Sequence, residues 1–161
     1  MKKLWLAPVL LSATAGVAQP QNAPVSVASA NFAPGLDDLM TMLVQPRHIK
    51  LYYAGTQRNW ELAVAELSDL RAAFGRISQA VPKYQDSDVD EAIKAIIVPK
   101  MQALDVAIAA ADAKRFGVAY GDLTAACNAC HVYLEHPYLV IEVPGAKAST
   151  GYSDQSFGVK P

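Results

Sequence analysis

The stretch FGVAYGDLTAACNACHVYL (residues 116–134) joins a helical repeat to a cluster of reactive side chains. Its apolar side chains recur at spacings of three and four: Phe116, Tyr120, Leu123, Cys127, Cys130 and Leu134. This spacing places them on one face of an α-helix. The pair His136-Pro137 is expected to end the helix, because a proline disfavours helical backbone at the residue before it. The pattern predicts a helix whose buried face carries both cysteines of the chain.

Two earlier stretches show the same helical spacing. The first is expected over about residues 36–55, with a kink at Pro46 and a stop at Gly55. The second follows a cap at Asn59 and should end before Pro82, which cannot continue a helix.

A third helical stretch opens after the sequence DSD (residues 86–88) and continues to Ile108, with Pro99 as an interruption. Asp112 marks the junction with the last helix. Helices joined by short loops pack side by side most simply when neighbours run in opposite directions. The sequence therefore predicts an all-α fold, an antiparallel four-helix bundle over residues 36–143.

The two ends of the chain differ from this helical part. Two lysines precede an apolar run and a set of small residues, so residues 1–18 are expected to be a cleaved signal peptide. Residues 19–35 are rich in Ala, Ser, Pro, Asn and Gln and are expected to form a flexible leader. The run YLVIEV (138–143) is β-like but has no second strand in the pattern, so we expect a short extended tail. Residues 144–161 are expected to be mobile.

The composition indicates one small exported domain. The chain has 161 residues, of which 52% are hydrophobic and 18% are charged. Its 14 basic residues are nearly matched by 15 acidic residues, so nothing in the charge points to nucleic acid. No segment after the signal peptide is long and apolar enough to cross a bilayer, and we expect a periplasmic mature chain without a membrane span.

Cys127 and Cys130 enclose two residues and are followed directly by His131. This Cys-x-x-Cys-His arrangement is the attachment site of c-type haem. Two thiols one helical turn apart can each add to a vinyl group on one edge of the porphyrin, while the adjoining imidazole reaches the iron. The motif predicts one covalently bound haem c, with its iron held by His131.

Three other uses of the cysteines fit less well. A thioredoxin-type dithiol would follow a strand at the start of a helix, whereas these cysteines lie deep in a helical pattern. A zinc site needs about four ligands, and the motif leaves only the distant His48 or His136 to complete it. A disulfide between Cys127 and Cys130 would close a very small loop and leaves His131 unexplained.

A haem motif near the end of the last helix of a four-helix bundle resembles the class II cytochromes c, the cytochrome c′-like group. The blocks VQPRHIKL (44–51), NWELA (59–63) and LTAACNACH (123–131) look like blocks of cytochrome c′-like proteins from proteobacteria. The resemblance covers about residues 36–143, and the extended tail departs from ordinary cytochrome c′. It implies a periplasmic haem protein and, by analogy, a homodimer formed through the first two helices.

The resemblance also places the first helix opposite His131, across the distal face of the haem. Met40 and Arg47 are seven residues apart and share one stripe of that helix. Met40 is expected to be the sixth iron ligand, since a thioether brings no charge into an apolar pocket. Arg47 is expected to bind a haem propionate through its guanidinium fork.

Two alternatives for the sixth position stay open. Leu51, on the same stripe, would cap an open five-coordinate iron on the cytochrome c′ pattern. Pro46 would instead shift the helical phase and bring His48 inward; otherwise His48 lies off the stripe, at the surface. Met42 should point away from Met40.

The leading functional prediction is electron transfer between redox partner proteins, with the haem iron cycling between its ferrous and ferric states. The alternative is a binding protein whose open distal face takes NO or CO, as cytochrome c′ does. An enzyme of the peroxidase type would need a distal acid–base histidine with an orienting partner, and we expect no enzymatic activity.

Overall fold

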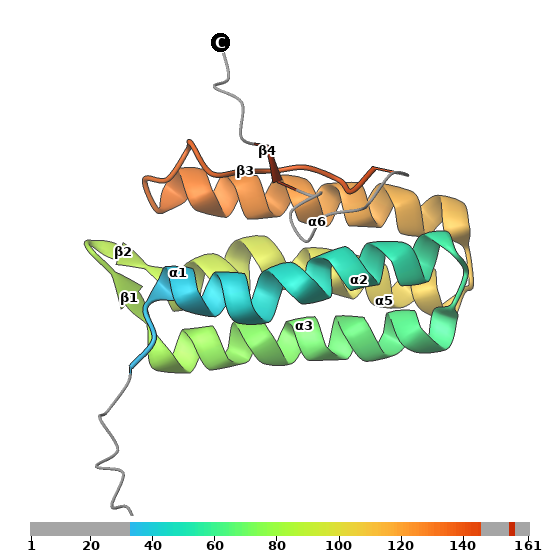
Figure 1. Ribbon diagram of the computed structural model, residues 1–161, viewed down its shortest axis with the longest axis horizontal. Helices are drawn as coiled ribbons and strands as arrows, with labels where there is room; N and C mark the ends of the chain where they lie inside the picture. The colour runs from blue at the N-terminus through green and yellow to red at the C-terminus, as the bar shows by residue number, and fades with distance from the viewer. Residues whose placement is uncertain (1–32, 146–154, 157–161) are drawn as a thin grey trace, which may run out of the picture. The chain divides into compact units, whose positions relative to one another are not determined.

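The computed structural model describes residues 33–145 and 155–156, and Figure 1 shows the course of the chain. The predicted signal peptide and most of the predicted leader and mobile tail lie outside these residues. The described helices are α1 (Leu36–Leu39), α2 (Gln45–Thr56), α3 (Trp60–Ala80), α4 (Val89–Ala92), α5 (Val98–Ala109) and α6 (Ala113–Tyr133), with π-helical segments η1 (Met40–Val44) and η2 (Ile93–Ile97). The strands are β1 (Lys83–Tyr84), β2 (Ser87–Asp88), β3 (Val140–Ile141) and β4 (Gln155–Ser156).

The prediction of a mostly helical chain is confirmed. The helical segments join into four rods, because α1, η1 and α2 are continuous, as are α4, η2 and α5. Consecutive rods run in opposite directions in Figure 1. The rods contact one another through α2 with α3, α5 with α6, α3 with α5, and α2 with α6. Their apolar faces form one core, whose largest fully buried side chains are Tyr120 and Phe116.

Polar side chains begin the helices where the sequence placed them. The Asn59 side chain accepts a hydrogen bond from the Leu62 amide at 3.1 Å, and Asp88 accepts one from Glu91 at 2.9 Å. Asp112 accepts from two amides at the start of α6. Each cap satisfies backbone N–H groups that have no partner inside the helix.

Each proline predicted to interrupt a helix follows a π-helical segment. Pro46 comes two residues after η1, and Pro99 two residues after η2. The residue before each proline donates its N–H five residues back, Gln45 to Met40 and Val98 to Ile93. A proline lacks the N–H that continues the regular ladder, and the wider π turn rotates all later side chains relative to an α-helix.

Gly55 was expected to stop the first helix through its conformational freedom, and this reason is wrong. Gly55 is buried inside α2, which ends one residue later. A Cβ atom at Gly55 would overlap the ring of Phe116 on α6. The glycine therefore allows α2 and α6 to approach closely.

The prediction that residues 138–143 stay without a strand partner is also wrong. Val140–Ile141 pairs antiparallel with Gln155–Ser156, inside the segment expected to be mobile. A second short ladder, β1 with β2, joins the second and third rods and was not predicted. Both ladders are only two residues long, too short for the period-two pattern that reveals a strand in sequence.

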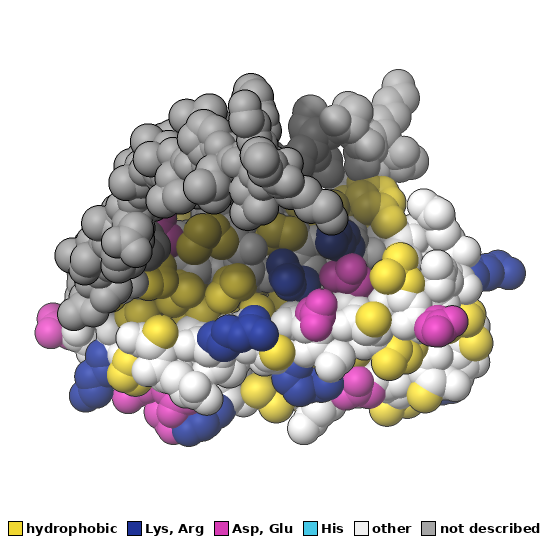
Figure 2. All heavy atoms as spheres, turned by 60° about the horizontal axis from the view of Figure 1, so that its bottom comes forward, with side chains coloured by type: hydrophobic (Ala, Val, Ile, Leu, Met, Phe, Trp, Pro, Cys, Tyr) yellow, Lys and Arg dark blue, Asp and Glu magenta, His cyan; other side chains and the backbone are white. Residues whose placement is uncertain are grey.

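The surface carries charges of both signs. Figure 2 shows basic and acidic side chains interspersed over one face, with hydrophobic side chains gathered in a hollow above them. Arg71 pairs with Asp105 at 2.7 Å between α3 and α5, and Lys94 pairs with Asp90 at 2.6 Å. Among the described residues, no helix is long and apolar enough to cross a membrane.

Candidate cofactor site

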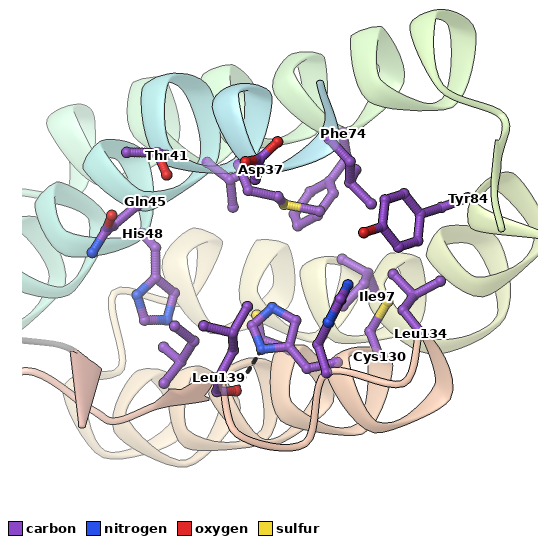
Figure 3. Close-up of a pocket in the computed structure, with 17 residues that line it drawn as sticks. Asp37, Thr41, Gln45, His48, Phe74, Tyr84, Ile97, Cys130, Leu134 and Leu139 are labelled. Atoms are coloured by element: carbon purple, nitrogen blue, oxygen red, sulfur yellow. Dashed lines mark hydrogen bonds between the residues drawn. The ribbon is translucent and has the colours of Figure 1, made fainter. Parts of the chain in front are cut away.

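A partly open cavity of about 250 Å³ lies between the first rod and the end of α6 (Figure 3). Side chains from all four rods, from the β1 strand and from the segment after α6 line it: Leu36, Asp37, Met40, Thr41, Val44, Gln45, His48, Phe74, Tyr84, Ile97, Cys127, Cys130, His131, Leu134, His136, Leu139 and Ile141. Most of these side chains are apolar, as in sites that hold an organic cofactor. Because the cavity is open to solvent on one side, a group larger than its enclosed volume could extend out of it.

All three residues of the predicted attachment motif line this cavity. Cys127 and Cys130 lie one turn apart on α6, half-buried and buried respectively. Burial raises the pKa of the Cys130 thiol, because a thiolate loses its hydration there. Both thiols therefore face the same apolar space, with Cys130 held in its protonated form.

His131 points one ring nitrogen at the backbone beyond α6. Its Nδ1 lies 2.8 Å from the Leu139 carbonyl oxygen, the contact drawn as a dashed line in Figure 3. A carbonyl oxygen only accepts, so Nδ1 carries the proton and donates it. Burial is the main cause that lowers the pKa of His131; the hydrogen bond to Leu139 opposes this shift, and the nearby His136 adds to it. The neutral imidazole thus keeps a lone pair on Nε2 for a metal ion.

On the opposite wall, the structure separates the two residues predicted for the distal side. Met40 lines the cavity from η1 and is half-buried. Arg47 is absent from the cavity lining, and its buried Nε has no hydrogen-bond partner among the described residues. Met42 is 51% exposed, which confirms that it points away. The π turn of η1 accounts for the separation of Met40 and Arg47, because it breaks the stripe they would share on a regular helix.

His48 is not a surface residue. It is 3% exposed, lines the cavity and points inward from α2 in Figure 3. Its Nε2 lies 3.1 Å from the Thr124 hydroxyl oxygen, and its Nδ1 lies 3.0 Å from the Tyr120 hydroxyl oxygen. The phase change that the sequence left open thus brings His48 inward, but both ring nitrogens contact hydroxyl groups of α6. Leu51 is fully buried and is absent from the cavity lining.

Two aromatic groups at another part of the cavity were missed by sequence reasoning. Tyr84 on β1 and His136 after α6 both line it, with ring centroids 5.3 Å apart. The Tyr138 hydroxyl lies 2.8 Å from His136 Nδ1. The position of His136 five residues after His131 was the one available signal, whereas Tyr84 reaches the cavity through a hairpin that the sequence did not reveal.

Within residues 33–145, no three His, Cys, Asp or Glu side chains gather closely enough to hold a metal ion by themselves. The macrocycle of a haem provides four nitrogen ligands, so a haem site needs only one or two axial ligands from the protein. At this cavity the oriented imidazole of His131 could supply one axial ligand, and the two thiols beside it could supply the covalent attachment.

Comparison of the chain with protein-family models, with curated proteins and with solved structures finds no match. The motif and the geometry of the cavity around it are therefore the grounds for assigning a function.

Proposed function

We propose that this chain is an exported mono-haem c-type cytochrome that transfers electrons, built as a four-helix bundle with the haem attached near the end of α6. The cavity that brings Cys127, Cys130 and His131 to one apolar space carries this proposal. The haem, when bound, supplies a one-electron redox centre.

The residues of the cavity would divide the work of holding the haem. Each thiol would add across one vinyl group, its sulfur to one carbon and its proton to the other. His131 would offer Nε2 to the iron, while the Leu139 carbonyl holds the other ring nitrogen. Met40, on the opposite wall, would offer its thioether to the iron, and apolar neighbours such as Val44 would keep water away. His48 is a poorer ligand, because binding iron would break one of its hydroxyl contacts.

A second candidate is a five-coordinate haem protein that binds NO or CO. It is favoured by the apolar side chains of Leu36 and Val44, which line the cavity beside Met40 and could cover an open iron position. A peroxidase-like reaction is not proposed. Both ring nitrogens of His48 face hydroxyl groups of α6 at 3.0–3.1 Å, so neither points at a place where a reacting atom could lie.

Covalent attachment tests the proposal directly. The full chain, produced in a bacterial periplasm with cytochrome c maturation proteins, should keep its haem after denaturation and acid extraction. Cys127→Ala and Cys130→Ala should weaken that retention, and the double variant should abolish it. His131→Ala should lose the native Soret position. The exposed Ala129 inside the motif provides the control, since Ala129→Ser should retain haem as the wild type does. Haem that is fully extractable from the wild type would contradict the proposal.

A further inference from the structure

The segment after α6, residues 138–145, folds back along that helix, and we call it the strap. Figure 1 shows the chain reversing at the end of α6 and running back over it toward β3. The reversal occurs at Glu135, whose φ of 63° is left-handed. Glu135 donates its N–H to Val132 and His136 donates to the His131 carbonyl, at 3.1 and 2.7 Å. These two bonds close the end of the helix and direct the chain backward.

The strap is held by its pairing with β4, by the hydrogen bond from the Leu139 N–H to the His136 carbonyl at 3.0 Å, and by one side chain from inside the attachment motif. Asn128 donates from Nδ2 to the Ile141 carbonyl at 2.8 Å, and its Oδ1 accepts from the Ile141 N–H at 2.7 Å. The asparagine side chain thus pairs with Ile141 as a neighbouring strand would. At the far end of the strap, the Tyr53 hydroxyl on α2 donates to the Gly145 carbonyl at 3.2 Å.

The strap supplies the carbonyl that receives the His131 Nδ1–H, and this carbonyl lies only two residues before Ile141. Tyr138 is 70% exposed and Leu139 is 37% exposed, so little of this part of the strap is held by burial. Fixing both backbone groups of Ile141 therefore restricts where the Leu139 carbonyl can lie. Burial of Pro144 holds the strap farther along, on the other side of Ile141.

We propose that Asn128 is a positioning residue for the iron ligand: it fixes the strap so that the Leu139 carbonyl orients the His131 imidazole. The role of His131 as an iron ligand rests on the proposed function. The strap and the hydrogen bond from His131 to Leu139 are features of the chain itself. An acceptor on the second ring nitrogen sets the tautomer, the ring plane and the basicity of a histidine ligand. The motif residue between the cysteines thus acts on the ligand that follows them.

Two substitutions separate the two hydrogen bonds of Asn128. In Asn128→Asp, a carboxylate oxygen still accepts from the Ile141 N–H, but nothing donates to the Ile141 carbonyl. In Asn128→Ala, both bonds are lost. Ala129→Ser changes the neighbouring exposed position and leaves the pairing intact.

The experiment compares these three variants with the wild type as holoproteins. Amide hydrogen exchange, followed by mass spectrometry, reports on the strap, and proton NMR reports on exchange of the His131 Nδ1–H. The NMR measurement uses a diamagnetic ferrous state, prepared with CO if the iron is otherwise high-spin. In Asn128→Ala both exchange rates should rise about tenfold, the effect of losing one to two ordinary hydrogen bonds. The exchange rates of Asn128→Asp should fall between those of the wild type and those of Asn128→Ala, and the rates of Ala129→Ser should match the wild type.

Two results would overturn the inference. One is an unchanged rate for the Nδ1–H of Asn128→Ala with its haem attached. The other is faster exchange of the Nδ1–H in this variant while the strap amides keep their wild-type protection, because the strap would then not be the route from Asn128 to His131. Failure of the proposed function looks different, because the wild type would then lack covalent haem. In that case the amide exchange of the strap and the ¹⁵N shifts of the His131 ring, measured in the same four proteins, still decide whether Asn128 sets the His131 tautomer.

Discussion

The buried imidazole of His48 on α2 lies between two hydroxyl groups of α6, those of Tyr120 and Thr124. The Tyr120 hydroxyl donates to the His48 carbonyl at 2.8 Å and also contacts Nδ1. The Thr124 hydroxyl donates to the Tyr120 carbonyl at 3.0 Å and contacts Nε2. Carbonyl oxygens only accept, so the direction of these two bonds is set by chemistry. A polar group this deeply buried needs such partners, because its lost hydration is otherwise uncompensated.

Removing the Tyr120 hydroxyl should therefore cost more than a surface hydroxyl. Tyr120→Phe keeps the ring in the core but takes away the partner of His48 Nδ1, and should lower the free energy of unfolding by about 1–3 kcal/mol. Tyr133→Phe, at an exposed position of the same helix, should change it by less than about 0.5 kcal/mol. Urea unfolding of the two holoproteins measures both values. Equal changes would contradict a role for the buried network in stability.

Gly55 makes a second prediction at the scale of one residue. An alanine in a helix is normally better than a glycine by about 1 kcal/mol, but the Cβ of Gly55→Ala would enter the ring of Phe116. Forcing extra volume into a packed core costs about 1–3 kcal/mol, and overlap with three ring atoms of a buried side chain places this site at the upper end, so the net effect should be destabilising. Gly117→Ala is the matched control, because no atom lies within 4 Å of its added Cβ. This control should raise the thermal midpoint, and Gly55→Ala should lower it.

At the scale of elements, the sequence predicted the existence and order of the helices well, because three of the four rods begin at a capping side chain. Asn59, Asp88 and Asp112 all cap helices as their residue types favour. The helix ends were less visible. After α2, α5 and α6 the chain turns at a left-handed residue that is not glycine: Arg58, Ala111 and Glu135. Sequence rules expect glycine there, so these turns gave no signal.

The π-helical segments explain why the side-chain phase was harder to predict than the helices. In a regular α-helix with 3.6 residues per turn, Met40, Arg47 and Leu51 would lie on one stripe. Five-residue hydrogen bonding in η1 rotates the chain before α2 begins, and the inward position passes to His48. Pro46 indicated that the helix would be irregular there. Whether the irregularity is a kink or a π-helical turn depends on how the neighbouring rods pack.

The cap of α6 predicts a pH dependence. The hydrogen bond from the Arg115 amide, followed by that from Lys114, lowers the pKa of Asp112 below its ordinary value of 3.8. A carboxyl group whose pKa is lower in the folded state stabilises the fold above the unfolded pKa, and this contribution is lost as pH falls through the folded pKa. Asp112→Asn keeps an oxygen acceptor but does not titrate. Between about pH 5 and about pH 2, the thermal midpoint of the wild type should fall further than that of Asp112→Asn. Parallel curves would exclude this cap as a source of acid sensitivity.

For the whole molecule, the sequence motif predicted the residues of the α6 wall of the cavity, but most residues of the opposite wall were not predicted. Cys127, Cys130 and His131 are adjacent in sequence, so their meeting at one site required no knowledge of the fold. Tyr84 reaches the cavity only because two short strands reverse the chain, and no periodic pattern marks that reversal. Contacts between distant segments depend on rod packing, which a single sequence does not specify.

The function of the whole molecule depends on what lies across the cavity from His131. Met40 and Met42 make a matched pair, because they sit on the same π-helical segment but only Met40 lines the cavity. If Met40 binds iron, the ferric holoprotein should be low-spin and show the sulfur-to-iron absorption band of Met-ligated cytochromes. Met40→Ala should then lose the band, become high-spin and shift to a lower reduction potential, since methionine ligation raises it. Met42→Ala, at a position 51% exposed, should retain all three properties. Optical spectra of the oxidised, reduced and CO-treated proteins decide the matter. A wild type that is already high-spin and binds CO rapidly would have an open iron position, and the gas-binding function would replace electron transfer.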